Sequence, residues 1–301
     1  MDMSHTALNM AANDALKRRL KRRKRLDLVM RALSFAAAVF SLVILAIVLY
    51  RVVVQSIGWL NVAFLTGKLS MFPEKAGISG VILGSLLLMV IVIPVTLILG
   101  VATAVYLEEY SRRNALRSVV QTAIANLAGV PSVIFGLLGL TVFSRFFGLG
   151  SSILAGGLTL SLLVLPLVVV SSSEAIKAVP QFLRDASYAL GATKWTTTWR
   201  VVLPTAMPGI LTGNILALSR AIGETAPLVV LGIPALILRS PKSLLDDFTA
   251  LPVQIYYWTL DTVLTPEYAH LAAATMIVLL VMMFVLNGAA IVIRRKFARR
   301  Y

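Results

Sequence analysis

Residues 174–209, EAIKAVPQFLRDASYALGATKWTTTWRVVLPTAMPG, form the longest polar stretch in the middle of a very apolar chain. Pro180 suits the start of a helix, because a residue in the first turn needs no amide donor. Gly191 suits a helix end, because glycine tolerates a positive φ. One helical face between them collects the apolar residues Phe182, Leu183, Ala186, Ala189 and Leu190. The pattern predicts a short helix that ends in a tight glycine turn.

A second short helix is predicted after this turn. Thr193 is placed to cap it, and Trp195 and Trp199 follow about one helical turn apart. Pro204 and Pro208 are expected to end it and to lead into the next apolar run. Because apolar runs of membrane-spanning length flank the stretch, the two helices are expected to form a hairpin at a membrane surface.

Composition places the chain among proteins that cross a membrane several times. Of its 301 residues, 58% are hydrophobic and 14% are charged, and the mean hydropathy is +0.89. A soluble domain of this size does not hide so much apolar surface. The net charge is +15, but the basic residues lie between and beyond the apolar runs, which argues for topology signals beside anionic lipid and against a nucleic-acid partner. Glu108 and Glu109, at the end of an apolar run, are expected to be solvated. The chain contains no cysteine, which excludes disulfides and thiolate metal sites.

Six segments are long and apolar enough to cross roughly 30 Å of hydrocarbon, which takes about 20 helical residues. We place these spans near residues 32–56, 79–107, 119–142, 153–173, 207–237 and 269–293. Pro94 and Pro131 indicate kinks in the second and third spans, and Pro227 and Pro234 indicate that the fifth bends or leaves the membrane early. The sequence therefore predicts an all-α polytopic membrane protein with six transmembrane helices.

Counts of Lys and Arg orient the chain in the membrane. With the N-terminus in the cytoplasm, residues 1–31, 108–118, 174–206 and 294–301 lie inside and carry 21 basic residues, whereas the outside loops carry five. Both termini and the loop at 174–206 are therefore expected on the cytoplasmic side. The basic N-terminal segment 1–31 is expected to have a disordered start and then a helix on the membrane surface, and residues 32–301 to form one transmembrane domain.

Arg220 and Glu224 interrupt the fifth apolar segment. By the predicted boundaries Arg220 lies near mid-span, where a charge costs about 2.5–3.5 kcal/mol on insertion scales. Residues four apart share a helical face, so the two are expected to pair. Gly223 is expected to let another backbone approach closely, and Thr225 adds a hydroxyl. The pair has two interpretations. It is either a structural ion pair that fixes helix packing, or part of a substrate path in which Arg220 binds an oxyanion through its planar fork.

The central hairpin resembles the coupling loop of ABC-importer permeases, whose pattern is Glu-Ala-Ala, three residues, Gly, nine residues, Ile, one residue and Leu-Pro. The matching residues are Asp185, Ala186, Ser187, Gly191, Val201, Leu203 and Pro204. Asp, Ser and Val stand in place of the Glu, the second Ala and the Ile of the pattern. The resemblance implies a type I (MetI-like) importer permease fold whose loop docks into a separate cytoplasmic ATPase. The alternative is an interfacial amphipathic hairpin with a purely structural role.

Two further motifs resemble phosphate-importer permeases of the PstA type, AGVPSVIFG at 128–136 and RAIGETAP at 220–227. The resemblance implies a multi-pass subunit of a prokaryotic inner membrane that works with a second, non-identical permease subunit, an ATPase dimer and an external phosphate-binding protein. It also implies that Arg220, Glu224 and Thr225 lie in the path of inorganic phosphate. No Gly-x-x-x-x-Gly-Lys-Ser/Thr loop occurs, so this chain is expected to be non-catalytic and without cofactors, with ATP and Mg on the partner ATPase.

Three other functions fit parts of the sequence. A permease for sulfate, molybdate or another oxyanion would use the same machinery with a different cargo. A secondary transporter or channel driven by an ion gradient would take up its substrate without ATP hydrolysis, and the spacing of the coupling-loop motif argues against it. A scaffold or sensor subunit without a pore would leave phosphate uptake intact after the change Arg220→Gln.

Overall fold

The computed structural model describes the backbone of residues 2–112, 114–237 and 241–297. Helices make up the regular structure of these residues, apart from one isolated antiparallel bridge between Ser152 and Asp247. The predicted all-α fold class is thus confirmed. The chain divides into two compact units, which are described separately.

The first unit, residues 1–54, consists of most of α1, a helix over Asp2–Ser56. This helix runs through the basic segment, for which the sequence predicts a disordered start followed by a helix. The apolar part of α1, Leu26–Ser56, is long enough and apolar enough to cross a membrane. Asp27 and Arg31 pair at 2.8 Å where this part begins.

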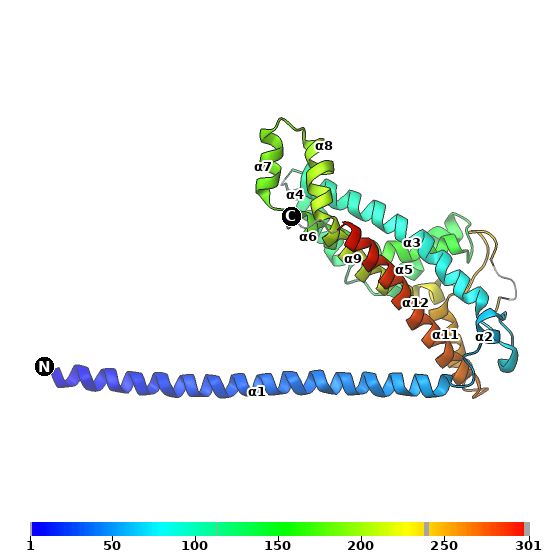
Figure 1. Ribbon diagram of the computed structural model, residues 1–301, viewed down its shortest axis with the longest axis horizontal. Helices are drawn as coiled ribbons and strands as arrows, with labels where there is room; N and C mark the ends of the chain where they lie inside the picture. Colours follow the sequence, from blue (N-terminus) through cyan, green and yellow to red (C-terminus); the bar gives the residue numbers. More distant parts are fainter. Residues whose placement is uncertain (1, 113, 238–240, 298–301) are drawn as a thin grey trace. The chain divides into compact units, whose positions relative to one another are not determined.

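The second unit begins at residue 55 and contains the other described helices. In chain order these are α2 (Val62–Thr66), η1 (Pro73–Lys75), α3 (Ser79–Val105), η2 (Tyr106–Tyr110), α4 (Ala115–Leu127), α5 (Ser132–Leu138), η3 (Gly139–Phe146), α6 (Ile153–Lys177), α7 (Gln181–Ala189), α8 (Lys194–Thr197), η4 (Thr198–Val202), α9 (Leu203–Gly223), α10 (Ala226–Leu231), α11 (Leu251–Asp261) and α12 (Tyr268–Phe297). Within this unit, α7 and α8 lie at one end and α2 and α11 at the other (Figure 1).

The core of the second unit is built around α6. Its most apolar window is 67% buried, the largest share among the described helices of spanning length. Helices α3 and α9 pack along it, and α5 and α10 also contact it. Leu160, Val164 and Val168 of α6 are buried in one apolar cluster with residues of all four helices. α6 therefore fixes the positions of the helices that carry the functional residues.

The predicted third span consists of two helices instead of one. α4 ends at Leu127, and the next helical stretch, Ser132–Phe146, runs at 105° to it. Pro131 caps this stretch with φ −55° and ψ 136°, and the residue before a proline is driven away from helical geometry. The kink expected at Pro131 is therefore a complete break. The described residues form five helices of spanning length, or six spans if this bent pair counts as one.

The predicted fifth span is displaced toward the hairpin. Helices α8, η4 and α9 form one helical run, Lys194–Gly223, in place of a span over 207–237. Pro204 and Pro208 do not end the second helix of the hairpin, because Pro204 lies in the first turn of α9 directly after the π-helical η4, and Pro208 lies inside α9. A wide π turn accommodates a missing amide, and membrane helices tolerate prolines where neighbouring helices support them.

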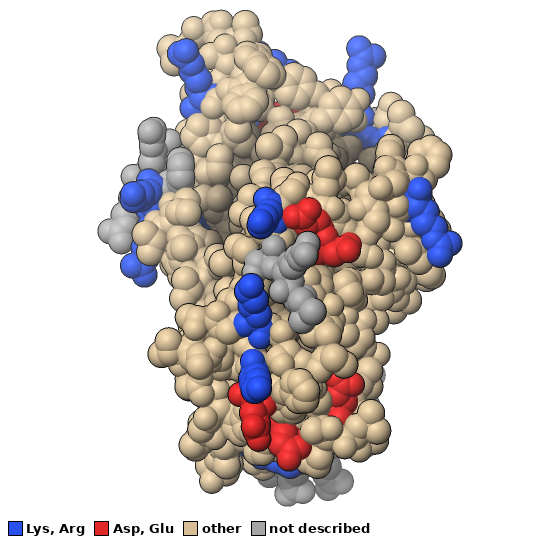
Figure 2. Space-filling model, turned by 90° about the vertical axis from the view of Figure 1, so that its right-hand side faces the viewer, with Lys and Arg blue, Asp and Glu red and all other residues tan. Residues whose placement is uncertain are grey.

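Apolar side chains dominate the outside of the second unit. Val90, Ile98 and Leu216 are each more than 60% exposed, at 63%, 65% and 70%. On the face shown in Figure 2, charged side chains form small, separate groups on a mostly uncharged surface. Such a surface requires contact with lipid or with another protein. With its helices of spanning length, the chain is a multi-pass membrane protein.

Candidate functional site

α7 and α8 form the predicted hairpin, and local sequence explains both ends of its turn. α7 begins directly after Pro180. Gly191 has a φ of +79°, a conformation that favours glycine, and its amide donates to the Tyr188 carbonyl at 2.9 Å. The Thr193 hydroxyl accepts a hydrogen bond from the Thr196 amide at 3.2 Å and so caps α8. The structure confirms the sequence prediction at these positions.

The two sides of α7 differ in exposure. One side is exposed and mostly apolar. We call it the docking face, and it consists of Phe182, Asp185, Ala186, Ala189 and Leu190. Leu190 is 89% exposed and Phe182 is 67% exposed. The opposite side, with Leu183, Arg184 and Ser187, is half-buried against the rest of the unit. An exposed apolar stripe on an anchored helix indicates a surface for another protein.

The seven residues of the predicted coupling motif fall into two groups. Asp185 and Ala186 lie on the docking face, where the Gln181 side-chain amide donates to Asp185 at 3.1 Å. Ser187 faces the other way, with its hydroxyl 2.8 Å from the hydroxyl of the buried Thr197 on α8. Of the other motif residues, Gly191 forms the turn and Leu203 is buried in the apolar cluster beneath the hairpin, whereas Val201 and Pro204 are half-buried. Their part in ATPase contact stays a prediction.

Arg220 and Glu224 form the expected ion pair. Arg220 Nε donates to Glu224 Oε1 at 3.1 Å, and the two side chains are 50% and 17% exposed. Because α9 ends at Gly223, Arg220 lies in the last turn of the helix and not at mid-span as predicted. The partial negative charge of a helix C-terminus favours a cation there. Within the part of the chain that the structure describes, the terminal nitrogens of Arg220 donate to no other group, so they are available to an anion.

The chain changes direction directly after this pair. Glu224 has an extended conformation, with φ −73° and ψ 123°. Thr225 is the N-cap of α10, and its carbonyl accepts from the Leu228 amide at 3.1 Å. Gly223 is exposed, and no described atom lies within 4 Å of the position that a Cβ would take. The close backbone approach expected at Gly223 is thus not found within the described chain.

The AGVPSVIFG and RAIGETAP motifs pack against each other. Gly136, the last residue of the first motif, lies in α5, and Pro227, the last residue of the second, lies in α10. A Cβ on Gly136 would lie 2.8 Å from Pro227 Cα and 2.9 Å from Val230 Cβ, which is closer than such atoms approach. The glycine thus allows the short helices that follow the two breaks, α5 and α10, to pack closely.

Comparison with known proteins decides the family. The family described as binding-protein-dependent transport system inner membrane component matches residues 96–301. This chain belongs to that family. The matched region contains the hairpin, the Arg220–Glu224 pair and the contact between α5 and α10.

Two relatives match this chain over nearly their whole length. Phosphate transport system permease protein PstA 1 of Mycobacterium tuberculosis is 35% identical over 99% of this chain and 97% of its own length. Phosphate transport system permease protein PstA of Yersinia pestis is 30% identical over 98% of each. Among solved structures, the inward-facing MetNI methionine ABC transporter has a chain that is 17% identical, with a TM-score of 0.58 over 74% of this chain and 96% of that chain. This likeness confirms the predicted importer permease fold.

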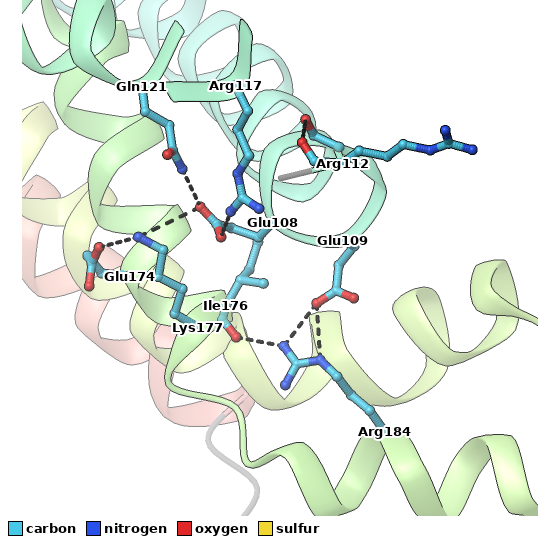
Figure 3. A network of polar contacts seen from close by, with 10 residues as sticks. Glu108, Glu109, Arg112, Arg117, Gln121, Glu174, Ile176, Lys177 and Arg184 are labelled. Carbon is cyan, nitrogen blue, oxygen red and sulfur yellow. Dashed lines mark hydrogen bonds and ion pairs between the residues drawn. The ribbon is translucent and has the colours of Figure 1, made fainter. Parts of the chain in front are cut away.

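Sequence reasoning missed a second charged site of this inner membrane component. Glu108 and Glu109 in η2 are only 6% and 7% exposed, and they pair with Arg117 at 2.6 Å and with Arg184 at 2.9 Å (Figure 3). The expectation that both carboxylates are solvated is wrong. Their partners come from α4 and α7, so the neighbouring sequence does not reveal them. The available signal was the set of basic residues predicted on the same side of the membrane, which includes Lys177.

The site contains cationic donors for an anion. Among the described residues, His, Asp and Glu side chains form no group of three or more that is placed to hold a metal ion. The half-exposed Arg220 guanidinium keeps terminal nitrogens that donate to no described group, and its part in binding an oxyanion stays a prediction.

Proposed function

We propose that this chain is one of two permease subunits of an ATP-driven importer of inorganic phosphate. The observation that carries the proposal is its similarity, over nearly the full length, to two proteins named phosphate transport system permease protein. The chain contributes half of the translocation path, and a second, non-identical permease subunit contributes the other half. Sulfate, molybdate or another oxyanion is the alternative cargo, because an arginine fork binds any of them.

The hairpin is the contact for a separate ATPase. Its docking face is exposed and mostly apolar, whereas the other side of α7 is joined to α8 through Ser187 and packs on the unit through Leu183, in the apolar cluster that contains Leu203. Because the opposite side of α7 is packed in this way, movement of a protein bound to the docking face is passed on to the unit. Asp185 adds one negative charge to the apolar face, which suits a basic group on the ATPase. ATP and Mg belong to the ATPase dimer, and this chain is non-catalytic.

The hairpin and both termini face the cytoplasm of a prokaryotic cell. The asymmetry of Lys and Arg supports this orientation, as does the last turn of α12, which carries Arg294, Arg295 and Lys296. Helices α2 and α11, at the opposite end of the second unit, then face the outside (Figure 1). The external phosphate-binding protein docks on that side.

Arg220 binds phosphate in the path between the two permease subunits. The burial and hydrogen bonding of the pair support this role. The guanidinium is half exposed in this chain, and its single bond to Glu224 leaves the terminal nitrogens unused. A planar fork with parallel N–H donors matches a phosphate oxygen pair. Glu224 orients the fork and offsets part of its charge, which helps the anion to leave again. Thr225 offers a hydroxyl beside the pair.

Reconstitution tests the proposal. The chain is co-expressed with the products of neighbouring genes, and the proteins that co-purify with it are identified. The complex is placed in liposomes with ATP at the ATPase and with phosphate-loaded binding protein on the other side. We expect ATP hydrolysis that depends on the binding protein and accumulation of phosphate. Preferential uptake of sulfate or molybdate would show that this oxyanion is the cargo in place of phosphate. Uptake that persists without ATP hydrolysis and collapses with the proton gradient would establish a secondary transporter.

Gly191→Pro tests the role of the hairpin in the same assay. Proline does not adopt the φ of +79° found at Gly191, so the hairpin turn has to rearrange. We expect the variant to insert into the membrane and to lose the ATPase. The matched control is Gly148→Pro, which changes another left-handed glycine, with φ +67°, in a loop remote from the hairpin in the chain. Normal ATPase recruitment by Gly191→Pro would contradict the docking role.

A further inference from the structure

η2, at the end of α3, contacts both helices of the hairpin, α7 and α8, which we call its first and second arms. It is a π-helical segment, a wider turn that recurs at functional positions of helices. It carries two neighbouring carboxylates, Glu108 and Glu109, with side chains only 6% and 7% exposed. Buried charges are strongly destabilising unless each is paired and hydrogen-bonded. The partners of these two residues therefore determine what η2 holds together.

Arg184 ties α7 to η2 and to the end of α6. Its Nε and Nη2 donate to Glu109 Oε1 at 3.2 and 2.9 Å. Its Nη1 donates to the Val179 carbonyl at 2.7 Å. Its Nη2 also donates to the Ile176 carbonyl at 2.9 Å (Figure 3). A rigid guanidinium held by four hydrogen bonds moves only together with its partners. Displacement of α7 therefore pulls on the ends of both α3 and α6.

The second arm of the hairpin, α8, also contacts η2. Lys194, the first residue of α8, places Nζ 5.3 Å from the centre of the Tyr110 ring, which is a cation–π contact. Leu183 of α7 and Val202 of η4 pack in the apolar cluster that contains Ala104 of α3. Both arms of the hairpin thus contact the end of one membrane helix.

Glu108 connects η2 to a different element. Arg117 Nη2 of α4 donates to Glu108 Oε2 at 2.6 Å, and Gln121 Nε2 of α4 donates to Glu108 Oε1 at 3.2 Å. Lys177 of α6 lies 3.8 Å from the same carboxylate. α4 leads to the break at Pro131, after which α5 packs on α10. One carboxylate thus binds the hairpin, and its neighbour binds the helix that precedes the break.

We infer that Glu108 and Glu109 form a coupling joint, in which Glu109 receives movement of the hairpin through Arg184 and Glu108 passes it to α4 through Arg117. The inference rests on the proposed function and deepens it, because it assigns the side chains that link ATPase docking to the broken helix. Both carboxylates are positioning residues, which act through their partners and contact neither ATPase nor phosphate. Neither belongs to the coupling-loop motif.

The test measures phosphate uptake per ATP hydrolysed in the reconstituted complex with the full chain. The variants are Glu109→Gln, Arg184→Gln and the double variant. Each single variant is expected to retain the ATPase and hydrolysis stimulated by the phosphate-loaded binding protein, with uptake per ATP lowered about tenfold. Because both residues act through one contact, the double variant is expected to be no worse than either single variant. It leaves no unpaired buried charge at this contact, so it tests the joint even if a single variant does not assemble.

Glu174→Gln is the matched control. Glu174 lies at the same end of α6 and pairs with Lys177 at 2.9 Å, but its side chain is 67% exposed. Its replacement is expected to leave uptake per ATP at the wild-type value. A loss equal to that of Glu109→Gln would show a general effect of charge at this end of the molecule and would overturn the inference.

Three further outcomes overturn the joint. These are wild-type uptake per ATP in the double variant, single effects that multiply in the double variant, and failure of all three variants to assemble, which would make the pair a folding requirement only. A wild-type complex that takes up no phosphate contradicts the proposed function instead. The wild-type arm therefore separates failure of the proposed function from failure of the joint.

Discussion

The coupling joint and the Arg220–Glu224 pair are two ion-pair sites in a very apolar protein, and they are built differently. The carboxylates of the joint are 6% and 7% exposed, and hydrogen bonds or ion pairs reach them from α4, α6 and α7. Arg220 is 50% exposed and donates one hydrogen bond to Glu224. The carboxylates of the joint are both bound by groups of the same chain, whereas the terminal nitrogens of Arg220 donate to no described group.

This difference predicts that the two sites respond differently to mutation. Removal of one partner from a buried pair costs about 3–5 kcal/mol, because the other charge stays buried. An exposed pair contributes about 0–1 kcal/mol, because water replaces either partner. Changes at the joint should therefore affect stability strongly, and changes at Arg220 should affect transport with little effect on stability.

The largest effect on stability is expected from Glu108→Gln. The variant leaves Arg117, which is only 13% exposed, without its carboxylate partner. We expect the free energy of unfolding to fall by about 3 kcal/mol, the lower end for a buried pair broken on one side. Thermal unfolding of the purified chain in detergent measures the change. An unchanged melting temperature would contradict the claim that the buried pairs of the joint contribute more to stability than the exposed Arg220–Glu224 pair.

A smaller loss of stability is expected from Gly136→Ala. Gly136 packs against Pro227, which belongs to the same motif as Arg220. The added Cβ would lie 2.8 Å from backbone of Pro227, so α5 and α10 have to separate. Overpacking of this kind costs about 1–3 kcal/mol. Gly129→Ala is the control, because its Cβ would meet only the Asn126 carbonyl at 3.4 Å. Equal melting temperatures for the two variants would refute close packing at Gly136.

A still smaller change in stability is expected from Arg220→Gln. The free energy of unfolding should fall by less than about 1 kcal/mol, because the arginine is half exposed. Phosphate uptake should nevertheless be lost while the complex still assembles. Arg220→Lys keeps the charge without the fork and should recover part of the uptake. Wild-type uptake in Arg220→Gln would make the pair structural, and a loss of stability as large as that of Glu108→Gln would erase the distinction between the sites.

The smallest effect is expected at Asp246, in the loop before α11. The backbone amides of Lys242 and Ser243 each donate to its carboxylate at 2.8 Å and lower the pKa of Asp246 below its usual value. A carboxyl with a lowered folded-state pKa stabilises the protein above its unfolded pKa, and that contribution is lost as the pH falls through the folded pKa. Asp246→Asn should therefore differ slightly from wild type near pH 7, with the difference shrinking below about pH 4. Thermal unfolding at several pH values measures it, and a difference that grows toward low pH would contradict the assignment.

Local patterns in the sequence predicted local features of the site correctly. Pro180, Gly191 and Thr193 define the hairpin because caps and turns depend on residues a few positions apart. Arg220 and Glu224 pair because a spacing of four residues places Glu224, the C-cap of α9, on the same side of the helix as Arg220. The all-α fold and its long apolar helices follow from composition and segment length.

Features that depend on tertiary structure could not be predicted in this way. Glu109 and Arg184 are 75 residues apart, and only the packing of α7 beside η2 brings them together. Pro204 was expected to end a helix, but the π turn before it and the neighbouring helices let the helix continue. The contact between Gly136 and Pro227 depends on two breaks whose angles no spacing encodes.

The helical run Lys194–Gly223 starts in the hairpin and carries Arg220 in its last turn. At 1.5 Å per residue, Lys194 and Arg220 are about 39 Å apart along it. A lever of this length that tilts by about 10° around its midpoint shifts each tip by about 3 Å, in opposite directions. That shift is about the length of one hydrogen bond. A small tilt imposed at the hairpin end of this run would therefore be enough to move the Arg220 guanidinium toward an anion or away from it.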